Sequence, residues 1–143
     1  MIGQHIWLIG GTTVGAAVNL TGTGTIMTWP ILEKCRLLQW GVIMASTATV
    51  TASVLTLTRV RLGTSTTLIL PLTIPITTST IGKVYYTEPG GLSTPADYTY
   101  YPGDRLLCVQ GTASTAGTGY PYIVVEPIPE RPANISNMVD GTT

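Results

Sequence analysis

Ten prolines and sixteen glycines are spread over the 143 residues of this chain, and they limit its possible folds more than any other feature. Proline breaks helix interiors because it lacks a backbone donor, and glycine weakens helices through its conformational freedom. No stretch between these residues keeps a hydrophobic period of 3.6. A helix is a plausible alternative only over residues 30–38, and there the strand-like sequence on either side favours a strand. The sequence therefore predicts an all-β protein.

Short runs of alternating or apolar residues predict the strands. They span residues 6–9, 17–20, 24–28, 35–44, 53–60, 67–74, 82–87, 105–110 and 120–126. Pro71 confines one of them to a sheet edge or a bulge. Pro102 and Gly103 predict a type II turn closed by Asp104, and the small residues 111–119 predict a flexible hairpin loop. Threonine, which is β-branched and favours extended backbone, makes up about a fifth of the chain. The pattern is typical of a β-sandwich or jelly roll.

The length allows one domain. We expect a β-sandwich over residues 1–126, in which residues 1–28 either join the sheets or form an arm. Three prolines within six positions predict that residues 127–143 form an extended tail, which cannot pair as an interior strand. Apolar side chains near both ends are therefore candidates to bind a neighbouring surface. These candidate interface residues are Ile6, Trp7, Ile128, Ile135 and Met138.

Charged residues make up only 10% of the chain, seven basic and seven acidic, whereas about 25% is usual. Because soluble monomers carry charge on their surfaces, we expect this chain to cover much of its surface with copies of itself or with a partner. No basic patch supports nucleic-acid binding. The longest apolar run, residues 68–76, contains two prolines and is too short to cross a membrane. We therefore expect a homo-oligomer with no nucleic-acid or membrane partner.

Reactive side chains are few. His5 is the single histidine, no Gly-x-Ser-x-Gly motif occurs, and the acidic residues fall mostly in expected turns or in the tail. Cys35 and Cys108 are expected to be free and buried, with a disulfide between them as the alternative. The glycine-rich stretches match no phosphate-binding motif. We expect no enzyme activity, no cofactor and no metal site.

Seven tyrosines, all between residues 85 and 122, are the most informative part of the composition. Tyrosine pairs across ordinary β-sheets, is enriched at protein interfaces and can stack on sugar rings. All three uses remain open from the sequence. Under the interface interpretation, the candidate residues are Tyr85, Tyr98, Tyr100 and Tyr101.

The second half of the chain carries an ordered set of motifs. They are Gly-Lys-Val-Tyr-Tyr (82–86), Pro-Gly-Asp-Arg-Leu (102–106), Thr-Ala-Gly-Thr-Gly (115–119), Val-Val-Glu-Pro (124–127) and Glu-Arg-Pro-Ala-Asn-Ile-Ser-Asn-Met (130–138). This order resembles the small β-rich virion proteins of tailed bacteriophages known as capsid decoration, or cement, proteins. The resemblance covers residues 80–138 and, more loosely, the region of Trp40 and Gly41.

The resemblance implies a β-sandwich, often a trimer, that is made in the host cytoplasm and sits on the capsid exterior. Its partner would be the major capsid protein of the assembled phage head, which it would stabilise by binding only the assembled state. Two alternatives are another virion component, such as a tail or fibre-base module, and a carbohydrate-binding β-sandwich.

Overall fold

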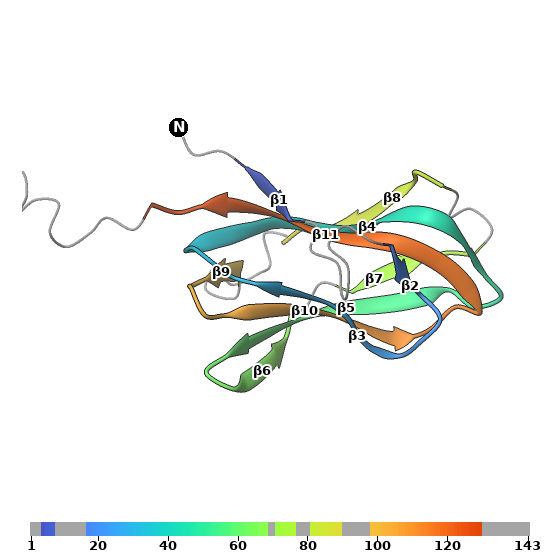
Figure 1. Cartoon of the computed structure of the whole chain (residues 1–143), viewed down its shortest axis with the longest axis horizontal. Helices are drawn as coiled ribbons and strands as arrows, with labels where there is room; N and C mark the ends of the chain where they lie inside the picture. Colours follow the sequence, from blue (N-terminus) through green and yellow to red (C-terminus); the bar gives the residue numbers. More distant parts are fainter. Residues whose placement is uncertain (1–3, 8–16, 69–70, 77–80, 90–97, 130–143) are drawn as a thin grey trace, which may run out of the picture.

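Residues 4–7, 17–68, 71–76, 81–89 and 98–129 are described by the computed structural model. They form two antiparallel sheets in two layers, and no α-helix occurs in these ranges (Figure 1). The expected all-β, sandwich-like single domain is confirmed.

Sheet A contains the two longest strands at its centre. Its order is β1-β11-β4-β8, with β2 also beside β11 and β9 beside β4. The strands are β1 (His5–Trp7), β2 (Val18–Asn19), β4 (Cys35–Thr49), β8 (Val84–Thr87), β9 (Thr99–Tyr100) and β11 (Ala116–Pro127). Strands β4 and β11 pair along their lengths with three register irregularities, one of which leaves Leu38 without an opposite residue. Such a bulge increases the local twist.

Sheet B has the order β3-β10-β5-β6, and β7 also pairs with β5. Its strands are β3 (Gly24–Pro30), β5 (Ser53–Arg61), β6 (Thr64–Thr67), β7 (Leu72–Ile74) and β10 (Arg105–Thr112). The single strand expected over residues 67–74 is therefore wrong, because two short strands lie along successive parts of β5. Pro71 falls between them, and both lie at the margin of the sheet, as its missing donor requires.

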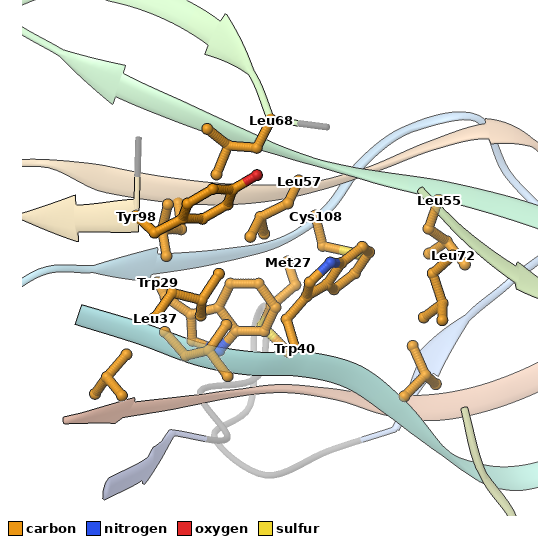
Figure 2. Packing of buried hydrophobic residues seen from close by; sticks show 14 of the residues in the cluster. Met27, Trp29, Leu37, Trp40, Leu55, Leu57, Leu68, Leu72, Tyr98 and Cys108 are labelled. Carbon is orange, nitrogen blue, oxygen red and sulfur yellow. The ribbon is translucent and has the colours of Figure 1, made fainter. Parts of the chain in front are cut away.

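The core between the sheets is built around two fully buried tryptophans, Trp29 from sheet B and Trp40 from sheet A (Figure 2). Leucines of β5 and methionines of β3 and β4 pack in the same cluster. The indole N–H of Trp29 donates to the backbone oxygen of Trp7 at 3.1 Å, which joins β3 to β1 of the other sheet. Burial of one large apolar side chain stabilises a fold by about 1.5–3 kcal/mol, so these side chains hold the layers together.

The flexible loop expected over residues 111–119 is wrong, because most of it is strand. Only residues 113–115 lie between β10 and β11, and Ser114 in this turn is buried. Its N–H donates to the Leu20 oxygen at 2.8 Å, and its hydroxyl donates to the Thr51 oxygen at 2.7 Å and lies 2.6 Å from the hydroxyl of Ser53. These hydrogen bonds hold the turn against Leu20 on one side and against residues 51–53 on the other.

The glycines of this stretch serve close packing. A Cβ atom at Gly119 would lie 2.5 Å from Cγ1 of Val42, and one at Gly117 would lie 3.0 Å from Cα of Ala48. Glycine inside a strand often marks such a close approach. The many small residues around these glycines instead suggested a loop.

The described ends of the chain belong to the sandwich. Residues 5–7 and 18–19 pair with β11, so these parts of residues 1–28 form strands and not an arm. The first residues of the expected tail still pair with the sandwich, because Pro127 lies opposite Cys35 and the N–H of Ile128 donates to the backbone oxygen of Lys34 at 2.9 Å. Residues 130–143 lie outside the described ranges.

Candidate functional site

Three pairs of acidic and basic side chains lie close together among the described residues. Glu33 lies 3.2 Å from Nδ1 of His5, and Arg36 and Arg61 each lie 2.7 Å from a carboxylate. Within these residues, no group of three or more His, Cys, Asp or Glu side chains could hold a metal ion. The candidate site we describe is therefore a surface.

The outer faces of the two sheets differ in chemistry. In β-strands alternate residues point to opposite faces, so the buried Trp40, Val42 and Ile123 place their neighbours in β4 and β11 on the outside. We call the central outward residues of sheet A the tyrosine face: Ile6, Gln39, Gly41, Ile43, Val84, Tyr86, Tyr120, Tyr122 and Val124. None of these nine carries a charge, and the charged Glu88 and the Arg36–Glu126 pair lie at the margins of the face. The corresponding face of sheet B is rich in threonine, with Thr25, Thr28, Thr56, Thr58 and Thr67.

Gly41 lies at the centre of the tyrosine face. Tyr122 of β11 lies opposite it on one side and Tyr86 of β8 on the other. A Cβ atom at this position would lie 2.3 Å from the backbone oxygen of Tyr85 and 2.9 Å from Cβ of Tyr86. The missing side chain therefore allows β8 to approach β4, and this approach fixes where the Tyr86 ring is presented.

Tyr122 is buried on this face although it is not part of the core cluster. Its hydroxyl donates to Oε1 of Gln39 at 2.6 Å. Burial raises its pKa, and the nearby Tyr86 and Glu88 raise the pKa further. The phenol thus stays neutral at physiological pH and keeps its donor, which makes Tyr122 a rigid support for its exposed neighbours.

The exposed part of the tyrosine face is apolar. Tyr86 is 54% exposed, Val84 43% and Ile6 64%, and Ile81 beside β8 is 77% exposed. Exposed apolar side chains on one face of a protein often mark an interaction site. Tyrosine at the centre and few charges are features of the buried part of protein interfaces.

The interface residues predicted from the sequence do not lie together in the structure. Ile6 lies on the tyrosine face, and Tyr101 is 41% exposed at one end of the sandwich. Trp7 and Tyr85 are partly buried against the core, and Ile128 is half-buried. Ile135 and Met138 lie outside the described residues.

Tyr98 and Tyr100 correct the sequence interpretation, because both are core residues with at most 5% of their surface exposed. Their position in or beside the two-residue strand β9 turns them toward the sandwich interior, where large amphipathic rings bury much apolar area. They are therefore unsuited to contact a partner on the described surface.

Sequence reasoning missed Tyr86 and Val84. The alternation within residues 82–87 places Val84 with Tyr86 and Lys83 with Tyr85, but it does not say which pair faces water. The charge of Lys83 suggests that the Lys83–Tyr85 side of the strand faces water. In the structure, however, the Lys83 ammonium group lies 5.8 Å from the centre of the Tyr85 ring. A long basic side chain can cover an aromatic ring while its charge stays in water, so this signal was misleading.

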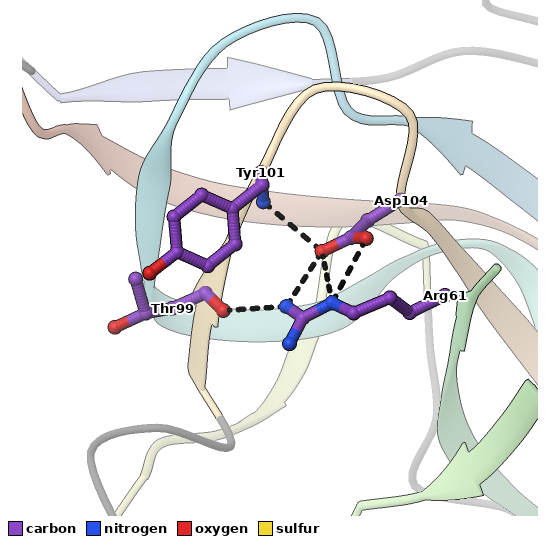
Figure 3. Close-up of polar contacts among 4 residues, drawn as sticks. All are labelled: Arg61, Thr99, Tyr101 and Asp104. Atoms are coloured by element: carbon purple, nitrogen blue, oxygen red, sulfur yellow. Dashed lines mark hydrogen bonds and ion pairs between the residues drawn. The ribbon is translucent and has the colours of Figure 1, made fainter.

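A salt bridge organises the end of the sandwich where β9 and β10 meet (Figure 3). Arg61 donates from Nε and Nη2 to the Asp104 carboxylate at 2.7–3.1 Å, and from Nη2 to the Thr99 oxygen at 3.1 Å. The same carboxylate accepts a hydrogen bond from the Tyr101 N–H at 3.0 Å, and the Asp104 N–H donates to the backbone oxygen of Tyr101 at 3.0 Å. With Gly103 at φ 96°, this confirms the expected type II turn closed by Asp104.

The turn also positions the exposed Tyr101 ring. The guanidinium of Arg61 lies 5.2 Å from the ring centre and the ammonium of Lys34 lies 5.3 Å from it. Cations at this distance are attracted by the face of the ring. Strand β5, the β3–β4 turn and the β9–β10 turn are therefore joined at this end.

Both cysteines are free and buried, so the alternative of a disulfide is excluded. Burial, followed by the charges of Glu33 and Asp104, raises the pKa of Cys35 to about 12, and burial alone raises the pKa of Cys108. Since the thiolate is the reactive form, we expect neither thiol to react with Ellman's reagent at pH 8 in the native protein. Two thiols per chain should react in denaturant. Rapid labelling of the native protein would contradict this burial.

No helix in the described part of the chain is long and apolar enough to cross a membrane. No protein-family model, curated protein or solved structure matches the chain.

Proposed function

We propose that this chain is a structural virion protein of the capsid decoration class, which binds the exterior of an assembled phage head and stabilises it. The observation that carries the proposal is the uncharged, apolar tyrosine face in a chain with only 10% charged residues. A subunit that works by covering a shell needs such a surface and needs no reactive site. The order of motifs over residues 80–138 supports the same class by resemblance.

The proposed partner is the major capsid protein, and the proposed state is a homo-oligomer, a trimer. A ligand that binds only the assembled lattice adds its binding free energy to the stability of that lattice. Antiparallel sheets are rigid platforms, so the tyrosine face would meet the shell with little loss of conformational entropy.

The test is a mixing assay in which the purified protein is added to undecorated phage heads. We expect Tyr86→Asp to weaken binding at least tenfold, because a charge placed in a buried apolar contact loses hydration without gaining a partner. Thr25→Asp is the matched control, since Thr25 is exposed on the outer face of sheet B. Co-sedimentation with the heads measures both variants. Equal binding by Tyr86→Asp and the unaltered chain would remove the tyrosine face from the proposal, and no binding by the unaltered chain would overturn the decoration function.

A carbohydrate-binding module is the second candidate, and the exposed ring of Tyr86 is the observation that favours it. Aromatic rings on a flat sheet can stack on sugars. Reproducible glycan-array binding that Tyr86→Ala abolishes would support this class. The third candidate, a tail or fibre-base module, would bind purified tails in the same sedimentation assay.

A further inference from the structure

An open groove lies at the end of the sandwich where β11 terminates. Residues 32–34 of the β3–β4 turn, Pro102 of the β9–β10 turn and residues 127–129 line it, with a volume of about 450 Å³. In Figure 1 this is the end toward which the arrow of β11 points. The salt bridge of Arg61 and Asp104 holds the β9–β10 turn that forms one wall.

The groove is suited to apolar side chains. Three of its residues are prolines, which have no backbone N–H to offer a polar ligand. Leu32 is 73% exposed at its rim, and Ile128 is half-buried in its wall. Its two charged residues are of opposite sign, and the Glu33 carboxylate is already engaged by His5 at 3.2 Å. Pockets of about 300–1,000 Å³ accept a small ligand or a few side chains.

The chain itself supplies a candidate occupant, because the fourteen residues 130–143 follow directly from the groove wall at Pro129. Their large apolar side chains include Ile135 and Met138. Ile135 is six residues beyond Pro129, which corresponds to about 20 Å of extended chain. To reach the groove of its own subunit, the segment would have to reverse direction within those six residues. The sequence favours an extended course instead, because Pro127, Pro129 and Pro132 fall within six positions.

We propose that Ile135 and Met138 of one copy occupy the groove of a neighbouring copy, so that each subunit gives one C-terminal segment and receives another. A contact of this head-to-tail kind closes into a ring when the rotation between copies allows it, which is how the proposed trimer would form. The exchange supplies the contact that would hold the proposed oligomer together. It is tested without phage heads, so its failure would leave the shell-binding proposal standing.

The test uses full-length chains with single cysteines added. Leu32→Cys protein is mixed with Ile135→Cys protein that carries a mass tag, and the mixture is oxidised. We expect a disulfide-linked pair containing one chain of each kind. The native thiols do not interfere because both are buried. The matched control is Val50→Cys, since Val50 is 72% exposed in the β4–β5 turn, away from the groove. It should give no pair with Ile135→Cys above background.

A chain that carries both Leu32→Cys and Ile135→Cys separates the two possible donors of the segment. Inter-chain disulfides as the main product would support exchange, and an internal disulfide in a monomer would show that the segment returns to its own groove and would overturn the proposal. Absence of both products would also overturn it. In parallel, Ile135→Asp with Met138→Asp should shift the mass measured by light scattering from oligomer to monomer while the circular dichroism spectrum is unchanged. An unchanged oligomer would contradict the exchange.

Discussion

Replacing Gly41 with alanine is expected to lower the free energy of unfolding by about 3 kcal/mol. The new Cβ atom would have to fit where the Tyr85 oxygen lies 2.3 Å away and Cα of Tyr86 lies 2.9 Å away. Both are backbone atoms of β8, so no side-chain rotation relieves the contact and the strand must move. Urea unfolding followed by circular dichroism measures the change.

Gly111→Ala is the matched control, because Gly111 also lies in a strand but its added Cβ would meet only the Val54 oxygen at 4.0 Å. We expect this variant to stay within about 1 kcal/mol of the unaltered protein. If both variants are equally stable, β8 does not dock closely on Gly41. The Gly41→Ala chain should also lose binding to phage heads, since the displaced β8 carries Val84 and Tyr86.

Replacing Asp104 with alanine is expected to lower the free energy of unfolding by about 2 kcal/mol at pH 7, less than the 3–5 kcal/mol of a fully buried pair. The variant removes the acceptor of both Arg61 and the Tyr101 N–H, and Asp104 itself is only 4% exposed. The Arg61 side chain is 33% exposed and can regain some hydration, which reduces the loss. Glu126→Ala, which breaks the more exposed pair with Arg36, should cost at most about 1 kcal/mol.

The effect of Asp104 should depend on pH in a definite direction. Burial raises the pKa of its carboxyl group, but the hydrogen bonds from Arg61 and the Tyr101 N–H outweigh burial, so the folded pKa lies below its ordinary value. The stabilisation is therefore complete above the unfolded pKa of about 3.9 and is lost as the pH falls through the folded pKa. The difference between the unaltered protein and Asp104→Ala should shrink below about pH 4. A constant difference from pH 7 to pH 2 would show that the charge of Asp104 contributes nothing.

The all-β class could be predicted because proline, glycine and threonine act locally on the backbone, whatever the chain packs against. The same holds for the turn at residues 101–104, whose Pro-Gly pair determines its own geometry. The strand expected over residues 35–44 continues to Thr49 in the structure. Its last residues are small or polar, and only the pairing with β11 identifies them as strand.

The candidate surface was harder to predict because residue type does not reveal which face of a sheet is covered. Tyr98 and Tyr86 have the same side chain, yet one is in the core and the other is 54% exposed. The difference depends on where the second sheet lies. The role of Gly41 is hidden for the same reason, since its close contact is with residues more than forty positions later in the chain.

The position of β11 has a consequence for biosynthesis. Among the strands of the described residues it is the last to be synthesised, yet it lies inside sheet A with β1 and β2 along one edge and β4 along the other. Until residues 116–127 have emerged, β1 and β2 lack their partner in sheet A, and β4 lacks the partner along one of its two edges. The apolar rows of β4 would remain open during this interval, when sheet edges are prone to aggregate. Cells that make this protein should therefore accumulate soluble full-length chains, while chains that stop before residue 116 should bind chaperones or be degraded.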